Sequence, residues 1–168
     1  MSHKAFVSST YLDLKEHRAW VVDELRKAGF WVDPMESWTA STNAPRLFSQ
    51  DRMKGCDLCV LLVAMRRGHV PQGETSSITQ LEYEAARERG IDVLVFMIDE
   101  QAPWPRQFDE LDKDPEMRPW RKQLMEDQGV GFFDDEPDSI EIGPALARWL
   151  RERIQRGADA PTAAPQPA

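Results

Sequence analysis

The sequence predicts a three-layer α/β domain with a five-stranded parallel sheet. Short apolar runs alternate with segments of helical periodicity along most of the 168 residues. The run from Leu58 to Ala64 is continuously apolar, which is typical of a strand covered on both faces. Strands that alternate with helices pair in parallel and receive helices on both faces of their sheet.

Each element has a local signal. Thr10 with Asp13 indicates an aspartate variant of the capping box, Pro45 suits a first helical position, and Ser76 or Ser77 can cap the third helix. Apolar runs bounded by turn residues predict strands at residues 4–8, 30–36, 58–64, 93–98 and 129–133. Helical periodicity predicts helices at residues 10–28, 45–54, 77–89, 119–127 and 143–156.

Composition favours one soluble domain over residues 1–156, followed by a Pro/Ala-rich tail at 157–168 that we expect to be disordered or a linker. The net charge of −8 argues against a nucleic-acid or anionic-membrane surface. No apolar run has the roughly 18 residues of a membrane span and the N-terminus has no signal-peptide pattern, so we expect a cytoplasmic protein.

Glu82 is the first candidate for a functional residue. On the predicted helix at 77–89 it lies beside the apolar face formed by Ile78, Leu81 and Ala85. A carboxylate next to buried surface is costly unless another group meets it. The alternative is a glutamate in the first helical turn, favoured there by the helix dipole.

The carboxyl ends of parallel strands form the rim where α/β folds bind ligands. At these ends we predict a polar pocket formed by Ser8, Ser9, Thr10, Glu36 and Arg66, joined by Ser77 at the start of the helix that carries Glu82. Helix capping by the serines and threonine, a strand end at Glu36 and a solvated loop arginine are the simpler alternatives.

Other chemistries lack support in the sequence. The segment after the first strand has no dinucleotide-binding glycines, which disfavours a Rossmann-type dehydrogenase. Cys56 and Cys59 enter a buried strand, unlike a redox pair at a helix N-terminus, and we interpret them as core residues. With two cysteines and three scattered histidines, we expect neither a zinc site nor a Ser-His-Asp triad.

Several of these motifs together resemble the DUF4062 domain family. They are the opening from Phe6 to Leu14 with Glu16 and Arg18, the pair Met35-Glu36, Cys56-Asp57 before the apolar strand, the segment from Ser77 to Ala86, and Phe132 with the helix that follows. The resemblance extends to about Arg156 and implies a flavodoxin/TIR-like fold.

This family is similar to TIR and SEFIR domains and, more distantly, to nucleoside 2-deoxyribosyltransferases. The resemblance implies an effector or signalling domain, in a bacterial defence or NTPase-linked protein, that binds NAD or a related nucleotide as substrate. It implies Glu82 as the catalytic residue for N-glycosidic cleavage, no further cofactor, self-association, and C-terminal NTPase or repeat domains as partners. A non-enzymatic adaptor for homotypic assembly and a deoxyribosyltransferase are the alternatives.

The sequence departs from the family pattern after the third strand. Family members often read Gly-x-Arg-Tyr-Gly, whereas this chain has Ala64 in place of the first glycine and Arg67 in place of tyrosine. If this loop shapes the pocket, we expect the pocket to bind a different ligand from that of other family members, or no ligand. Gln80 replaces a frequent acidic residue, which we interpret as a surface change.

Overall fold

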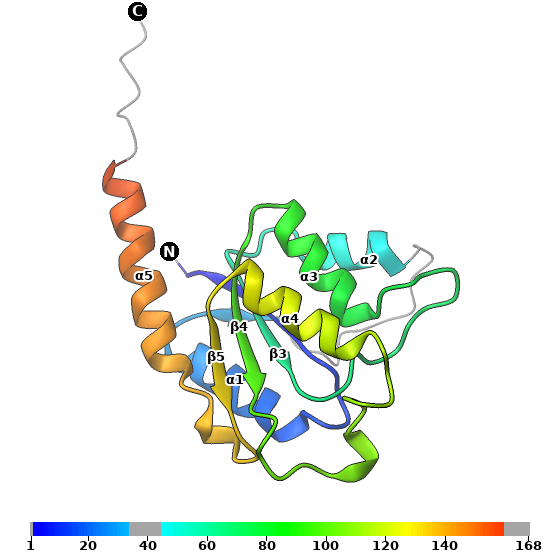
Figure 1. Cartoon of the computed structure of the whole chain (residues 1–168). Helices are drawn as coiled ribbons and strands as arrows, with labels where there is room; N and C mark the ends of the chain where they lie inside the picture. The colour runs from blue at the N-terminus through cyan, green and yellow to red at the C-terminus, as the bar shows by residue number, and fades with distance from the viewer. Residues whose placement is uncertain (1, 34–44, 160–168) are drawn as a thin grey trace, which may run out of the picture.

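The computed structural model describes residues 2–33 and 45–159 and confirms the predicted α/β fold (Figure 1). Five parallel strands form one sheet in the order β2-β1-β3-β4-β5. The strands are β1 Lys4–Ser8, β2 Trp31–Val32, β3 Leu58–Val63, β4 Asp92–Ile98 and β5 Val130–Phe133. The helices are α1 Lys15–Lys27, α2 Pro45–Arg52, α3 Ile78–Glu88, α4 Met117–Asp127 and α5 Ile142–Asp159, with 3-10 turns η2 Arg106–Phe108 and η3 Pro137–Ser139.

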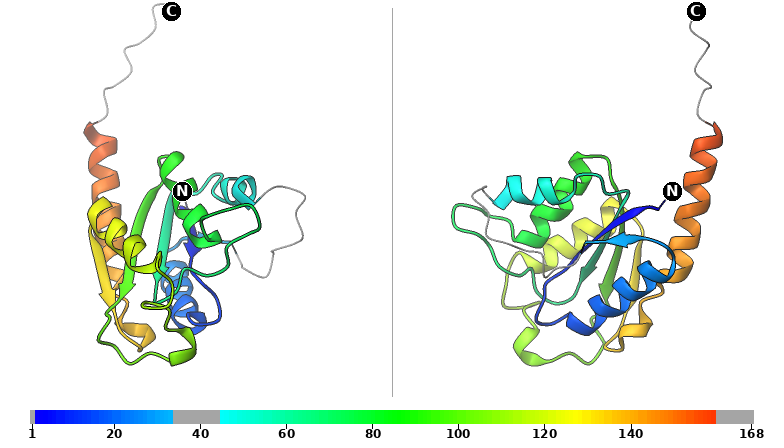
Figure 2. Two further views of the ribbon diagram at one scale, coloured as in Figure 1. Left: turned by 45° about the vertical axis from the view of Figure 1, so that its right-hand side comes forward. Right: turned by 180° about the vertical axis from the view of Figure 1, so that it is seen from behind.

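Helices cover both faces of the sheet, as the two views of Figure 2 show. Successive side chains of a strand point to opposite faces, so alternate residues of β1 serve different layers. Phe6 packs with Met53, which directly follows α2, and with Cys59 of β3 and Ala85 of α3. Ala5 and Val7 belong to the larger core. The sheet therefore separates a layer of α2, α3 and α4 from a layer of α1 and α5.

The strand order is that of flavodoxin-like folds, in which the chain reverses direction across the sheet between β1 and β3. Ser8 at the carboxyl end of β1 pairs in register with Leu61 of β3. The connections that leave β1 and β3 therefore diverge from neighbouring points at the carboxyl edge. This is the position at which open α/β sheets bind their ligands.

Helix α1 begins at Lys15, five residues after the predicted start, and its N-cap is Leu14, which has no side-chain oxygen. The predicted capping box of Thr10 and Asp13 is therefore wrong. A turn closed by the hydrogen bond from Leu14 N to Tyr11 O separates β1 from the helix. Thr10 and Asp13 precede the helix and take part in contacts with distant residues, described below.

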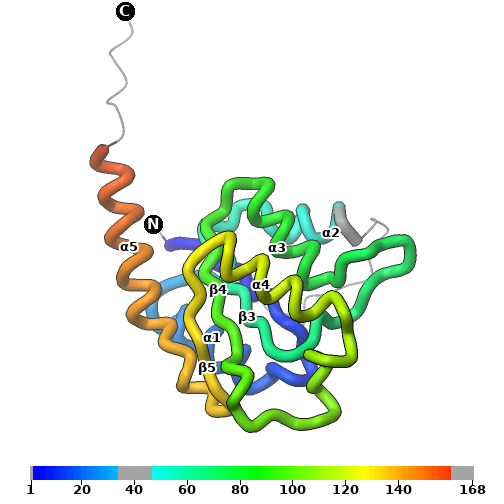
Figure 3. Tube along the Cα trace, viewed as in Figure 1, coloured from blue at the N-terminus to red at the C-terminus, as the bar shows by residue number. Residues whose placement is uncertain are grey.

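The other boundaries differ less. Strand β2 has two residues, and α4 begins two residues before the predicted position. Helix α5 continues to Asp159, past the predicted boundary at residue 156, and its C-terminal half extends beyond the rest of the domain (Figure 3).

Cys59 is fully buried in β3, and burial raises the pKa of its thiol well above the ordinary value. Cys56 is also a free thiol, half-buried, and its pKa is likewise raised by burial. Both cysteines thus hold their protons at neutral pH, in agreement with the predicted structural role. In the described part of the chain, no helix is long and apolar enough to cross a membrane.

Candidate functional site

Glu82 lies on the buried face of α3, in the interior of the domain, and only 3% of its surface is exposed. It is the fifth residue of the helix, beyond the first turn where the dipole interpretation placed it. The hydroxyl of Ser8 donates a hydrogen bond to Glu82 Oε2 at 2.5 Å, across 74 residues of sequence. The fold therefore supplies the partner that a carboxylate at this position requires.

The environment of Glu82 favours its protonated form. Burial raises the pKa of this carboxyl from 4.5 to about 7, against the opposing influence of the Ser8 hydrogen bond and of the nearby Arg18 and Arg52 guanidinium groups. A carboxyl with a pKa near 7 is present in both protonation states at neutral pH. Such a group can release or accept a proton under physiological conditions.

Arg18 of α1 binds the residues on both sides of Ser8, through the Val7 carbonyl and the Ser9 hydroxyl. Its Nη1 donates to Val7 O at 2.7 Å and to Ser9 Oγ at 3.4 Å. This clamp fixes the residue that hydrogen-bonds Glu82. The sequence contained a signal for Arg18 that our prediction missed: it continues the buried helical stripe of Leu14, Val21 and Leu25, where a charged side chain needs a partner.

Thr10, Asp13 and Arg66 form a second polar cluster at the carboxyl edge. The side chain of Asp13 is fully buried, and its Oδ1 lies 3.5 Å from Arg66 Nε. Burial raises the pKa of Asp13, although neighbouring Thr10 and Arg66 oppose this shift. Thr10 Oγ1, both Asp13 oxygens and Arg66 Nε have no hydrogen-bond partner of good geometry among the residues described. Arg66 is thus an ion-pair partner, not the solvated loop residue of the simpler interpretation.

The connection from β3 to α3 packs directly on Thr10. Gly68 has a φ of +86°, and a Cβ atom at this position would lie 2.8 Å from Thr10 Cγ2. Only glycine meets both demands without strain. A backbone hydrogen bond from Ile78 N to His69 O closes the connection onto the start of α3. The two loops at the switch point are therefore in direct contact.

Ser77, the last predicted pocket residue in this loop, is the N-cap of α3. Its hydroxyl accepts from Gln80 N at 3.2 Å, and Gln80 Oε1 accepts from Ser77 N at 2.8 Å. Gln80 is therefore a capping-box partner, and the interpretation as a surface change is wrong. Gln80 also accepts a bond from Arg67, which donates twice to Asp114 of the β4–α4 connection.

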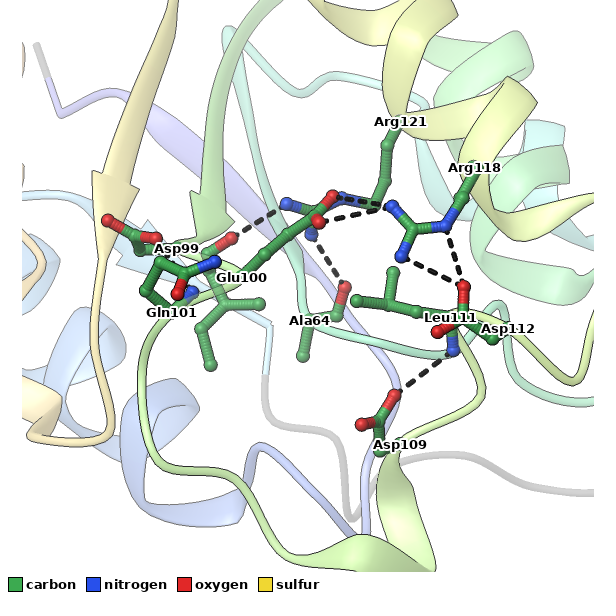
Figure 4. Close-up of polar contacts among 10 residues, drawn as sticks. Ala64, Asp99, Glu100, Gln101, Asp109, Leu111, Asp112, Arg118 and Arg121 are labelled. Atoms are coloured by element: carbon green, nitrogen blue, oxygen red, sulfur yellow. Dashed lines mark hydrogen bonds and ion pairs between the residues drawn. The ribbon is translucent and has the colours of Figure 1, made fainter.

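Arg121 of α4 closes the carboxyl ends of β3 and β4 (Figure 4). It is 4% exposed, and its guanidinium donates to Ala64 O at 3.0 Å and to Ile98 O at 2.8 Å. Arg118 lies beside it and pairs with Glu100 and Asp112. Sequence reasoning missed Arg121, because both of its hydrogen bonds go to backbone carbonyls, which no residue type marks, and its ion pair with Glu100 joins two separate segments. One buried cation therefore satisfies the last carbonyl of β4 and the carbonyl directly after β3.

The structure brings most of the predicted residues together at one edge of the sheet. Ser8 contacts Glu82, Ser9 contacts Arg18, and Thr10 and Arg66 converge on Asp13. Predicted Glu36 lies outside the described residues. No group of three or more His, Cys, Asp or Glu residues with metal-binding geometry occurs in the described ranges. The site therefore contains one buried carboxyl, Glu82, whose pKa is near 7 and which lies near the cationic side chains of Arg18 and Arg52.

Comparison with known families gives a match that covers most of the domain. A family model described as "Domain of unknown function (DUF4062)" matches residues 4–142, from β1 to the start of α5. The match spans Ser8, Arg66 and Glu82. No curated protein matches the sequence.

Proposed function

Because the chain belongs to the DUF4062 family, which is defined by sequence and not by an activity, we propose a function from the Glu82 site: hydrolysis of the N-glycosidic bond of NAD or a related nucleotide. The observation that carries this proposal is the Glu82 carboxyl, buried at the switch point of the sheet and held by Ser8. The similarity of the family to TIR domains supports the same choice of substrate.

The reaction requires a carboxylate opposite the sugar. As the bond from ribose C1′ to the nicotinamide nitrogen breaks, its electron pair leaves with nicotinamide and positive charge develops on the ribose. The Glu82 carboxylate stabilises this charge, and the stabilisation is large because buried charges are poorly screened. Water then attacks C1′ and loses a proton to Glu82. The products are nicotinamide, ADP-ribose and one proton.

Neighbouring groups have supporting roles in this scheme. Ser8 and its clamp Arg18 orient the carboxylate, and Arg66 at the adjacent rim can hold a phosphate oxygen. Because Glu82 is nearly closed off from solvent, side chains around it must move when substrate enters. We propose that self-association favours the open arrangement, so turnover by the isolated chain is slow.

The test measures nicotinamide release from NAD by the 168-residue chain, alone and fused to an oligomerising scaffold. Parent and Glu82→Gln are compared, since glutamine keeps an acceptor for Ser8 but has no charge. Glu84→Gln, at a half-buried position of the same helix, is the matched control. Release by the parent and the control, with at least a 100-fold loss in Glu82→Gln, supports the proposal.

A folded and assembled parent that releases no nicotinamide contradicts hydrolysis and favours the non-enzymatic adaptor. Transfer of a base between nucleosides without NAD cleavage favours the deoxyribosyltransferase. The activity should also rise with pH through about 7, because the ionised carboxylate is the active form.

A further inference from the structure

We propose that a groove between the start of α1 and the β4–α4 connection binds the adenine base of the dinucleotide. This inference rests on the proposed NAD hydrolysis and extends it, because it names the part of the substrate that is bound away from the scissile bond. Adenosine monophosphate (AMP), which carries this base, can test the groove without any cleavage.

The groove has a volume of about 560 Å³, within the range of small-molecule sites. Its walls include Trp104 and Phe108 from the β4–α4 connection, Leu12 from the β1–α1 connection and His17 from the first turn of α1. Both views of Figure 2 show α1 and this connection at the same end of the sheet. His17 fixes Trp104 by an edge contact, with ring centroids 5.6 Å apart. A planar ring can therefore stack on a wall that is already ordered.

The polar groups of the groove suit a base with amino groups. Trp104 Nε1–H is closed to solvent and has no acceptor within the described ranges, so a small rotation of the Trp104 side chain would let a ring nitrogen accept a hydrogen bond from it. Glu16 and Asp135, both exposed at the rim, can accept from an exocyclic amine.

Arg66 lies beside this groove, against two of its lining residues. Its guanidinium lies over the Phe108 ring, with 5.6 Å to the centroid, while Nε faces Asp13. Ser8, the last residue of β1, contacts Glu82, and Asp13 of the groove follows five residues later, so these two positions are at most about 18 Å apart. An extended dinucleotide can span this length with its pyrophosphate at Arg66.

The first experiment titrates the 168-residue chain with AMP in a calorimeter. Trp104→Ala should weaken AMP binding roughly 5- to 100-fold, the usual effect of losing one base-stacking side chain. Trp104→Phe keeps a flat ring and should lose less. Trp31→Ala, which removes a half-exposed tryptophan from β2 at the far edge of the sheet, should leave binding unchanged.

Phe108→Leu keeps an apolar side chain but removes its flat face. It provides a second test of AMP affinity if Trp104→Ala does not fold. Its AMP affinity should also fall. Absence of AMP binding by the folded parent, or binding that neither Trp104→Ala nor Phe108→Leu weakens, overturns the proposal.

The second experiment compares kcat/KM for NAD with kcat/KM for nicotinamide mononucleotide, which has the same scissile bond but no adenine. The parent should prefer NAD, and the preference should fall toward one in Trp104→Ala. Cleavage of both compounds with a ratio that does not depend on Trp104 refutes the groove and leaves hydrolysis intact. AMP binding that depends on Trp104, without cleavage of either compound, refutes hydrolysis and supports the groove.

Discussion

Replacement of Glu82 by glutamine should stabilise the domain at neutral and alkaline pH. The folded protein holds this carboxyl at a pKa of about 7, against 4.5 for the same group in water. Below pH 4.5 the carboxyl is protonated in both the folded and the unfolded chain, and it costs nothing. As the pH rises from 4.5 through 7, the unfolded chain releases the proton more readily, and the folded state loses stability.

The magnitude follows from the pKa difference. Each pKa unit corresponds to about 1.4 kcal/mol, so the shift amounts to about 3 kcal/mol of destabilisation above pH 8. Glutamine has no charge to bury and still accepts a hydrogen bond from Ser8. The free energy of unfolding of Glu82→Gln should therefore exceed that of the parent by up to about 3 kcal/mol at pH 8, and by much less at pH 5.

Urea unfolding at pH 5, 6, 7 and 8 measures this difference. With a slope of about 2 kcal/mol/M, the midpoint of Glu82→Gln should lie about 1.5 M above that of the parent at pH 8. Other titrating groups act equally in both proteins and cancel. Glu84→Gln controls for the loss of one negative charge from α3. Two results would refute the reasoning and indicate a purely structural glutamate. One is a stability difference between Glu82→Gln and the parent that is the same at pH 5 and pH 8, and the other is a parent that is more stable than Glu82→Gln at pH 8.

Three further changes test the surroundings of this residue. Ser8→Ala removes a hydrogen bond that lowers the pKa of Glu82, so the midpoint of the pH–activity profile should move upward. Gly68→Ala should cost about 2 kcal/mol in thermal unfolding because of its positive φ and the contact with Thr10, and a Thr10→Ser background should recover the part due to that contact. Arg121→Met should lower the unfolding free energy by about 3 kcal/mol in urea, since two buried carbonyls lose their donor; a loss below about 1 kcal/mol would contradict this role.

The sequence was sufficient for the fold because its signals are local. The apolar run at residues 58–64 and the capped helix that begins after Ser77 each determine their own structure. The start of α1 was predicted five residues too early for the opposite reason. Thr10 and Asp13 have the spacing of a capping box, but the fold places them against Gly68 and Arg66, which local pattern cannot reveal.

The candidate site was predictable where one residue breaks a pattern. Glu82 beside an apolar face required a partner, and the parallel topology placed the end of β1 within its reach. Arg18 breaks the pattern of α1 in the same manner and was overlooked. Arg121 could not be found in this way, because its hydrogen bonds go to backbone carbonyls, which every residue possesses, and its acidic partner Glu100 lies 21 positions earlier in a loop.

The β3–α3 and β4–α4 connections are linked to each other at the carboxyl edge of the sheet, and these links have a consequence for local unfolding. Arg67 joins the β3–α3 connection to Asp114, and a backbone bond runs from Glu110 N to Met65 O. Arg121 attaches α4 to the end of β3 at the same place. Neither loop can detach without breaking bonds to the other, so their amide hydrogens should exchange with solvent as one cooperative unit. A ligand that orders one loop would then slow exchange in both.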